Sequence, residues 1–122
     1  MKIRIKGNSL RIRLSKSEVD QFAKVGQLEE CTNFLNSTLF YGVKSTAAKT
    51  MSADFNLNKI TIFIPQNMLM EWAFSNKVSL VDQMPLGEKG TLQILLEKDF
   101  KCIDADVNED QSDYFENPLK SC

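Results

Sequence analysis

Apolar and polar residues alternate near the start of the chain. Residues 2–6 and 10–14 place an apolar side chain at every second position, which is typical of strands that cover a core with one face. The Gly-Asn-Ser sequence at 7–9 predicts a turn between them. Two further strands are predicted at 28–34 and 38–43.

Between these two pairs of strands lies a segment whose apolar residues have the spacing of a helix. Ser15 and Glu18 form the pattern of a capping box, which predicts that a short helix begins there. Val19 and Phe22 then lie on one apolar side of that helix. Gly26 is a typical helix stop, because glycine adopts the left-handed conformation at little cost.

The whole pattern recurs fifty residues later. Residues 10–30 align with residues 60–80 without a gap. The matched apolar pairs include Leu10 with Ile60, Ile12 with Ile62, Leu14 with Ile64, Val19 with Leu69, Phe22 with Trp72, Ala23 with Ala73 and Leu28 with Val78. The second copy predicts strands at 51–55, 60–64, 78–82 and 91–96, and a helix from 65 to about 74.

The order of elements predicts an α+β fold that is mainly β. We expect tandem ββαββ repeats, at 1–46 and 51–99, that form one small pseudo-two-fold β-barrel with two short helices. Each repeat alone is too small to bury a core, so the two must complete each other in a single domain, 1–99. Residues 100–122 are expected to form an irregular acidic C-terminal tail.

Composition narrows the class of protein. The chain has 122 residues, of which 43% are hydrophobic, and no apolar run long enough for a membrane helix, so we expect a cytoplasmic protein. It has no histidine, the commonest general base and metal ligand, so we expect neither an enzyme nor a cofactor. Cys31, Cys102 and Cys122 form no CxxC pair, and the state of the last two stays open between paired, metal-bound and free.

Charge is distributed unevenly along the chain. Residues 1–50 carry nine Lys or Arg against four Asp or Glu, whereas residues 100–122 carry two against six. A basic beginning and an acidic end indicate either two surfaces with different partners or a tail folded over its own basic face. The sequence leaves both alternatives open.

Two segments resemble a known family. GNSLRIRLSKSEVDQF, from Gly7, and ITIFIPQNMLMEWAF, from Ile60, resemble the turn, strand and short helix of AbrB-like and MazE-like swapped-hairpin barrels. The resemblance covers about residues 1–99 and implies a fused tandem of a unit that is usually a homodimer. The opening and the acidic end also resemble small bacterial proteins of unknown function.

The resemblance implies DNA binding or an antitoxin-like regulator. In the family, the turn and basic strand approach the duplex, which here implies Lys2, Arg4, Lys6, Asn8, Arg11 and Arg13. The alternative is that these residues only solvate the wet face of a hairpin. The second copy has Thr61 and Phe63 where the first has Arg11 and Arg13, which favours that alternative.

The second helix suggests a second kind of site, a contact surface for a protein. Met68, Met70 and Phe74 make it apolar nearly all round, so it needs cover on both sides. The candidates for this cover are the tail, through Tyr114 and Phe115, a homodimer partner, or a ligand in a methionine-lined groove. A protein-interaction domain that uses this helix and the tail, without DNA binding, is therefore the alternative function.

Two further hypotheses rank below these. In the tail, Asp104, Asp106, Asn108 and Asp110 have the spacing of a calcium loop, but Glu109 replaces the required glycine, so a solvated acidic linker is favoured. An enzyme that handles phosphorylated substrates inside a basic barrel ranks last, because the basic strand KIRIK carries no glutamate for a metal.

Overall fold

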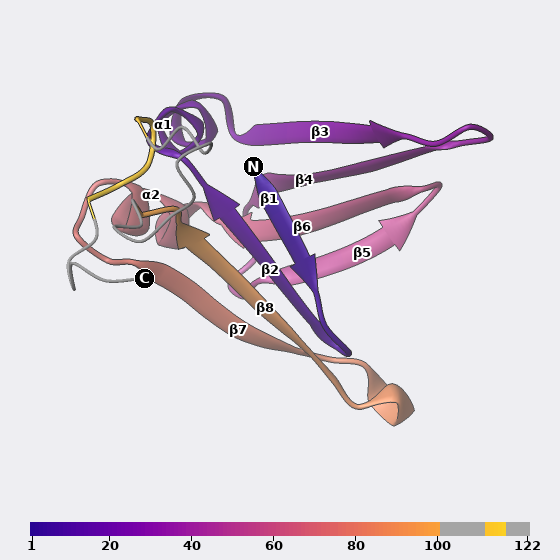
Figure 1. The fold of residues 1–122 in the computed structure, drawn as a ribbon. Coiled ribbons are helices and arrows are strands. Elements are labelled where there is room, and N and C mark those ends of the chain that lie inside the picture. Colours follow the sequence, from indigo (N-terminus) through magenta and orange to yellow (C-terminus); the bar gives the residue numbers. More distant parts are fainter. Residues whose placement is uncertain (101–111, 117–122) are drawn as a thin grey trace.

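The computed structural model describes residues 1–100 and 112–116, which form eight strands, two α-helices and one 3-10 turn (Figure 1). The strands are β1 (Lys2–Ile5), β2 (Ser9–Leu14), β3 (Gln27–Asn33), β4 (Thr38–Thr46), β5 (Ser52–Asn56), β6 (Lys59–Pro65), β7 (Ser79–Pro85) and β8 (Thr91–Lys98). The helices are α1 (Lys16–Val25), α2 (Gln66–Ala73) and the short turn η1 (Gly87–Lys89). Every predicted strand and helix is present within a few residues of its expected bounds.

The strands form two four-stranded sheets. Sheet A has the order β1-β2-β8-β7 and sheet B has the order β3-β4-β6-β5. In each sheet the two central strands run parallel, β2 with β8 and β4 with β6, and the outer pairs are antiparallel hairpins. Each sheet therefore combines one hairpin from the first half of the chain with one from the second half. An α+β fold that is mainly β is confirmed.

The expected small β-barrel is not confirmed, because the two sheets do not close into one barrel. At the seam between the two sheets, β5 meets β7 through side chains instead of a backbone ladder. The Met51 backbone N–H donates to Asp82 Oδ2 at 3.0 Å, and the Ala53 N–H donates to Met84 Sδ at 3.4 Å. The sheets diverge away from this seam (Figure 1). Because no continuous ladder joins the edges, the fold is two packed sheets.

Both helices lie at one end of the sheets, and local sequence fixes where they begin and end (Figure 1). The predicted capping box begins α1, with the Ser15 N–H donating to Glu18 at 2.9 Å. Gly26 ends α1 at φ 85°, and its N–H donates to the Phe22 carbonyl. Pro65 directly precedes α2, where its missing N–H costs nothing.

One hydrophobic core lies between the sheets and the helices, and both halves of the chain contribute to it. Phe22 of α1 and Trp72 of α2, which the repeat aligns, are both fully buried in it. The core also contains Ile12 and Leu14 of β2 and the equivalent residues of β6, Ile62 and Ile64, which are all fully buried. The Trp72 indole N–H donates to the Val78 carbonyl at 3.0 Å, so burial leaves its polar atom satisfied.

The described part of the tail, residues 112–116, packs back onto the body. Asp113 accepts hydrogen bonds from the N–H and hydroxyl of Ser17 at the start of α1. The Phe115 N–H donates to the Asp99 carbonyl at 2.7 Å, and the Phe115 ring contacts Phe100. Within residues 1–100 and 112–116, no helix is long and apolar enough to cross a membrane.

Candidate functional site

The outer face of sheet A carries a group of basic side chains. The strand pairing places Lys2 beside Arg13 and Arg4 beside Arg11, while the alternate residues of β2 point into the core. We call this surface the cationic face, and it consists of Lys2, Arg4, Lys6, Arg11 and Arg13. All five cations predicted from the sequence therefore lie on one hairpin and on one side of it.

One carboxylate from β8 organises the centre of the cationic face. Glu97 Oε1 accepts from Arg11 Nη2 at 2.6 Å and from Arg13 Nε at 2.6 Å. The Glu97 side chain is only 14% exposed. One negative charge shared between two guanidinium groups fixes both and leaves a net positive charge.

Lys2 lies at one end of the cationic face, where the tail docks. Its Nζ is 3.1 Å from Asp99 and donates to the Tyr114 hydroxyl at 2.7 Å. The same Nζ lies 4.5 Å from the centre of the Tyr114 ring. The described tail therefore contacts the basic surface at this corner.

Arg4 and Lys6 form the open part of the cationic face. Both side chains are exposed, and neither makes an ion pair or hydrogen bond within the described ranges 1–100 and 112–116. Asn8 has a structural role at this end, because its carbonyl accepts from the Gln93 N–H at 2.9 Å and its amide donates to the Lys89 carbonyl. The turn after β1 is thus held against the loop between β7 and β8.

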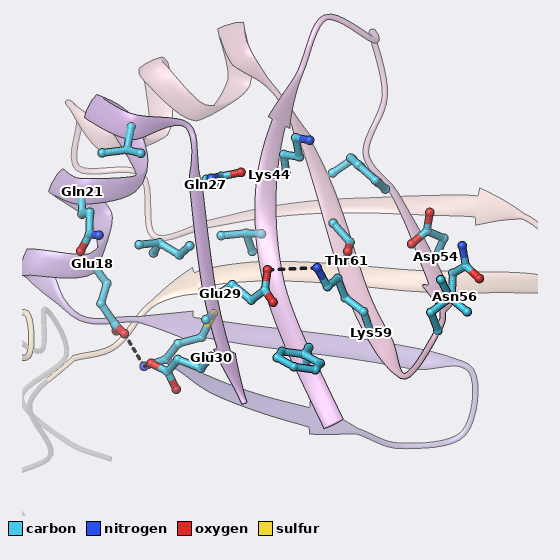
Figure 2. A pocket seen from close by; sticks show the side chains of 18 residues that line it. Glu18, Gln21, Gln27, Glu29, Glu30, Lys44, Asp54, Asn56, Lys59 and Thr61 are labelled. Atoms are coloured by element: carbon cyan, nitrogen blue, oxygen red, sulfur yellow. Dashed lines mark hydrogen bonds and ion pairs between the residues drawn. The ribbon is translucent and has the colours of Figure 1, made fainter. Parts of the chain in front are cut away.

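Sheet B has a different outer face, which sequence reasoning did not identify as a site. A hollow of about 880 Å³ lies over β3, β4, β6 and β5 and is bounded by α1 (Figure 2). Glu29 and Lys59 form an ion pair of 3.2 Å across its middle, and Lys44 and Asp54 also line it (Figure 2). Charges of both signs line this hollow, whereas one sign dominates the cationic face.

Gly42 shapes the floor of this hollow. A Cβ atom at this position would lie 2.1 Å from the Leu28 carbonyl oxygen, closer than any side chain can approach. The absence of a side chain on Gly42 lets the backbone of β3 approach β4 closely. Glu29, which pairs with Gly42 in the ladder, can then reach across it to Lys59.

A smaller hollow of about 330 Å³ lies where β1, α1 and the tail meet. The Met1 ammonium is ion-paired there with Glu18 and with Glu30. Burial alone would raise the pKa of the Glu18 carboxyl, but the Met1 ammonium and the Ser15 N–H outweigh it and lower that pKa. These groups satisfy one another, and we assign them a structural role.

The predicted contact residues of α2 lie in different environments. Met68 packs against the core and Met70 is half-buried, while Phe74, just after the helix, is 74% exposed. Phe115 of the tail packs against the core that contains Trp72 of α2. Lys98 Nζ lies 5.5 Å from the Trp72 ring and 5.4 Å from the Phe115 ring, between the two.

The predicted metal residues lie outside the part of the chain that the structure describes. These are Asp104, Asp106, Asn108 and Asp110, and Cys102 and Cys122 lie outside it as well. Among the described residues, no cluster of His, Cys, Asp or Glu could hold a metal ion. Cys31 is described, and its thiol is free and exposed.

Residues 1–119 match a family described as a family of unknown function, DUF7009, so the chain belongs to that family. No curated protein matches the chain. No solved structure matches it either.

Proposed function

We propose that this member of DUF7009 is a non-catalytic module that binds a polyanion, with nucleic acid as the favoured class, on its cationic face. The observation that carries the proposal is the gathering of five cations on one solvent-facing hairpin. Two of them, Arg4 and Lys6, have no partner among the described residues. Phosphate contacts of this kind supply most of the affinity of non-specific nucleic-acid binding.

The spacing of these cations suits an extended anionic backbone. Side chains two residues apart on a strand lie roughly 6.6 Å from each other, because each residue rises about 3.3 Å. One strand of B-form DNA carries a phosphate about every 3.4 Å of axis, so neighbouring cations can reach alternate phosphates. Glu97 neutralises part of the charge of Arg11 and Arg13, so the cationic face keeps a net positive charge for phosphate contacts.

We further propose that the fold is a fused tandem of one swapped-hairpin unit. Two hydrogen bonds at equivalent positions of the two repeats support this interpretation. The Phe40 N–H donates to the Asn58 carbonyl at 2.9 Å, and the Gln93 N–H donates to the Asn8 carbonyl at 2.9 Å. The position equivalent to Arg11 is Thr61, on the mixed-charge hollow. The tandem therefore offers one basic face per chain, and one ligand per chain is expected.

Titration of the full chain with labelled duplex DNA, single-stranded RNA and heparin tests the proposal. The double variant Arg4→Ala/Lys6→Ala should weaken binding by roughly tenfold and reduce the slope of log K against log salt by about 2. Lys24→Ala/Lys49→Ala removes the same charge from exposed sites elsewhere and should change binding little. Absence of binding to all three polyanions at low salt would overturn the proposal.

A protein-interaction role of α2 and the tail, without nucleic acid, is the second candidate. The exposed Phe74 ring beside the half-buried Met70 favours it. Under this alternative, Phe74→Ser should abolish self-association or partner capture measured by sedimentation velocity. A monomer whose polyanion affinity is unaffected by Phe74→Ser would leave the polyanion proposal in place and exclude this one.

A further inference from the structure

Strand β3 has an open edge. Its ladder with β4 uses the backbone groups of every second residue, as the bonds from Ser45 N–H to the Gly26 carbonyl and from Phe34 N–H to the Ser37 carbonyl establish. The backbone groups of Gln27, Glu29, Cys31 and Asn33 therefore point away from β4. Within residues 1–100 and 112–116, no hydrogen bond uses these groups.

Two of the other edge strands carry a protection that β3 lacks, since among the described residues β3 has at its edge only the ion pair of Glu30 with the Met1 ammonium. At β5, side chains of β7 accept hydrogen bonds from the N–H groups of Met51 and Ala53. Strand β1 is short and carries Lys2 and Arg4, which is a usual defence against strand pairing. Strand β3 is seven residues long, and contains no lysine or proline.

The hairpin that carries this edge also projects from the body. Figure 1 shows β3 and β4 extending beyond the tip of β5 and β6. Every residue from 29 to 37 is exposed, including Phe34, at 58%, and Leu35, which is fully exposed. Folding alone gives no reason to display two apolar side chains at the tip of an arm.

The charges beside this edge select the kind of segment that can add to it. Glu29 and Glu30 are neighbours on β3, and both line the hollow over sheet B together with Glu18 of α1 (Figure 2). Glu29 and Glu30 are almost half exposed, so they can accept further cationic partners beside Lys59 and Met1. A second copy of β3 centred on Glu29 or Glu30 would place like charges directly opposite each other, which is destabilising.

We infer that the edge of β3 is a docking site for an extended, basic segment of a partner protein, which adds as a fifth strand to sheet B. The segment would hydrogen-bond to the outward groups of Glu29 and Cys31, and its lysines or arginines would lie near Glu29 and Glu30. Strand addition of this type draws affinity from the main chain and specificity from alternate side chains. This site is separate from the cationic face on sheet A.

Proline at position 31 tests the main-chain contact. Cys31→Pro deletes an outward N–H and leaves the ladder to β4 intact, whereas Cys31→Ala keeps that N–H and is the matched control. The probe is a fluorescein-labelled, end-capped peptide of alternating lysine and valine, with a matched glutamate-valine peptide, at about 0.15 M salt. We expect the wild type and Cys31→Ala to bind the lysine peptide equally, and Cys31→Pro to bind it about tenfold more weakly.

Four outcomes would overturn the inference. The first two concern the wild type, which would fail to bind the lysine peptide up to about 1 mM or would bind the two peptides equally. The third is that Cys31→Pro binds the lysine peptide as tightly as the wild type. The fourth is that light scattering shows a wild-type dimer, which Cys31→Pro converts to a monomer. Should Cys31→Pro fail to fold by circular dichroism, the wild type supplies a second measurement. The rate of alkylation of the exposed Cys31 thiol is then measured by mass mapping, with and without the lysine peptide. The peptide should slow this alkylation, and an unchanged rate also overturns the inference.

Discussion

Arg13 of β2 donates from Nε to Glu97 of β8 at 2.6 Å, across a junction of parallel strands that come from opposite ends of the chain. The contact ties the basic first hairpin to the second half of the fold. It also sets the net charge of the proposed binding surface, because Glu97 neutralises part of it.

We predict that Glu97→Gln strengthens polyanion binding. Removing this carboxylate frees Arg11 and Arg13 while keeping a side chain of similar size, so affinity for duplex DNA or heparin should rise about three- to tenfold at low salt. Fluorescence anisotropy at several salt concentrations measures this change. A weaker complex would mean that Glu97 is needed to hold the arginines in position, and unchanged affinity would place the ligand elsewhere.

Gly42→Ala should destabilise the protein strongly. The added methyl group would meet the Leu28 carbonyl oxygen at 2.1 Å, so β3 would have to move away from β4. We expect a loss of about 2–4 kcal/mol in the free energy of unfolding, measured by urea denaturation. Gly87→Ala is the control for glycine loss, because nothing lies within 4 Å of a Cβ there, although its φ of 64° imposes a smaller cost.

Phe22→Ala should cost about 3–5 kcal/mol of unfolding free energy, because the ring is fully buried and its removal leaves a cavity. Phe74→Ala removes the same atoms from a ring that is 74% exposed and should change stability by less than about 1 kcal/mol. Chemical denaturation of both variants gives the comparison. Equal losses would contradict the assignment of Phe22 to the shared core.

The Glu18 carboxyl should make stability depend on acidic pH. Burial opposes its ionisation, but the Met1 ammonium and the Ser15 N–H lower its pKa in the folded state. The carboxylate therefore adds stability above its usual pKa of about 4.3, and this contribution is lost as pH falls through the lowered folded value. Thermal melts from pH 6 to pH 2.5 should show a smaller loss for Glu18→Gln than for the wild type.

The sequence predicted local structure well because short-range physics decides it. The alternation in β1 and β2, the capping box at Ser15 and the stop at Gly26 all depend on neighbours in the chain. The expected small β-barrel is not confirmed, because closure depends on how the edges of the two sheets meet, and local pattern does not encode that. Side-chain bonds such as Met51 to Asp82 replace a ladder there, and no periodicity encodes them.

The candidate site was partly predictable. Alternating charges placed five cations on one face, but no pattern indicated that Glu97, more than eighty residues away, would pair with two of them. The hollow over sheet B was missed for a similar reason. Its shape depends on the missing side chain of Gly42, and a lone glycine within a strand pattern indicates only a close backbone approach.

The parallel pairing of β2 with β8 has a consequence for biosynthesis. Leu10 lies beside Ile94, so the strand that completes sheet A leaves the ribosome more than eighty residues after the strand it joins. Such distant pairing slows folding and leaves the basic hairpin without its neighbour while synthesis continues. Nascent chains that end before β8 should therefore be protease-sensitive and should depend on chaperones.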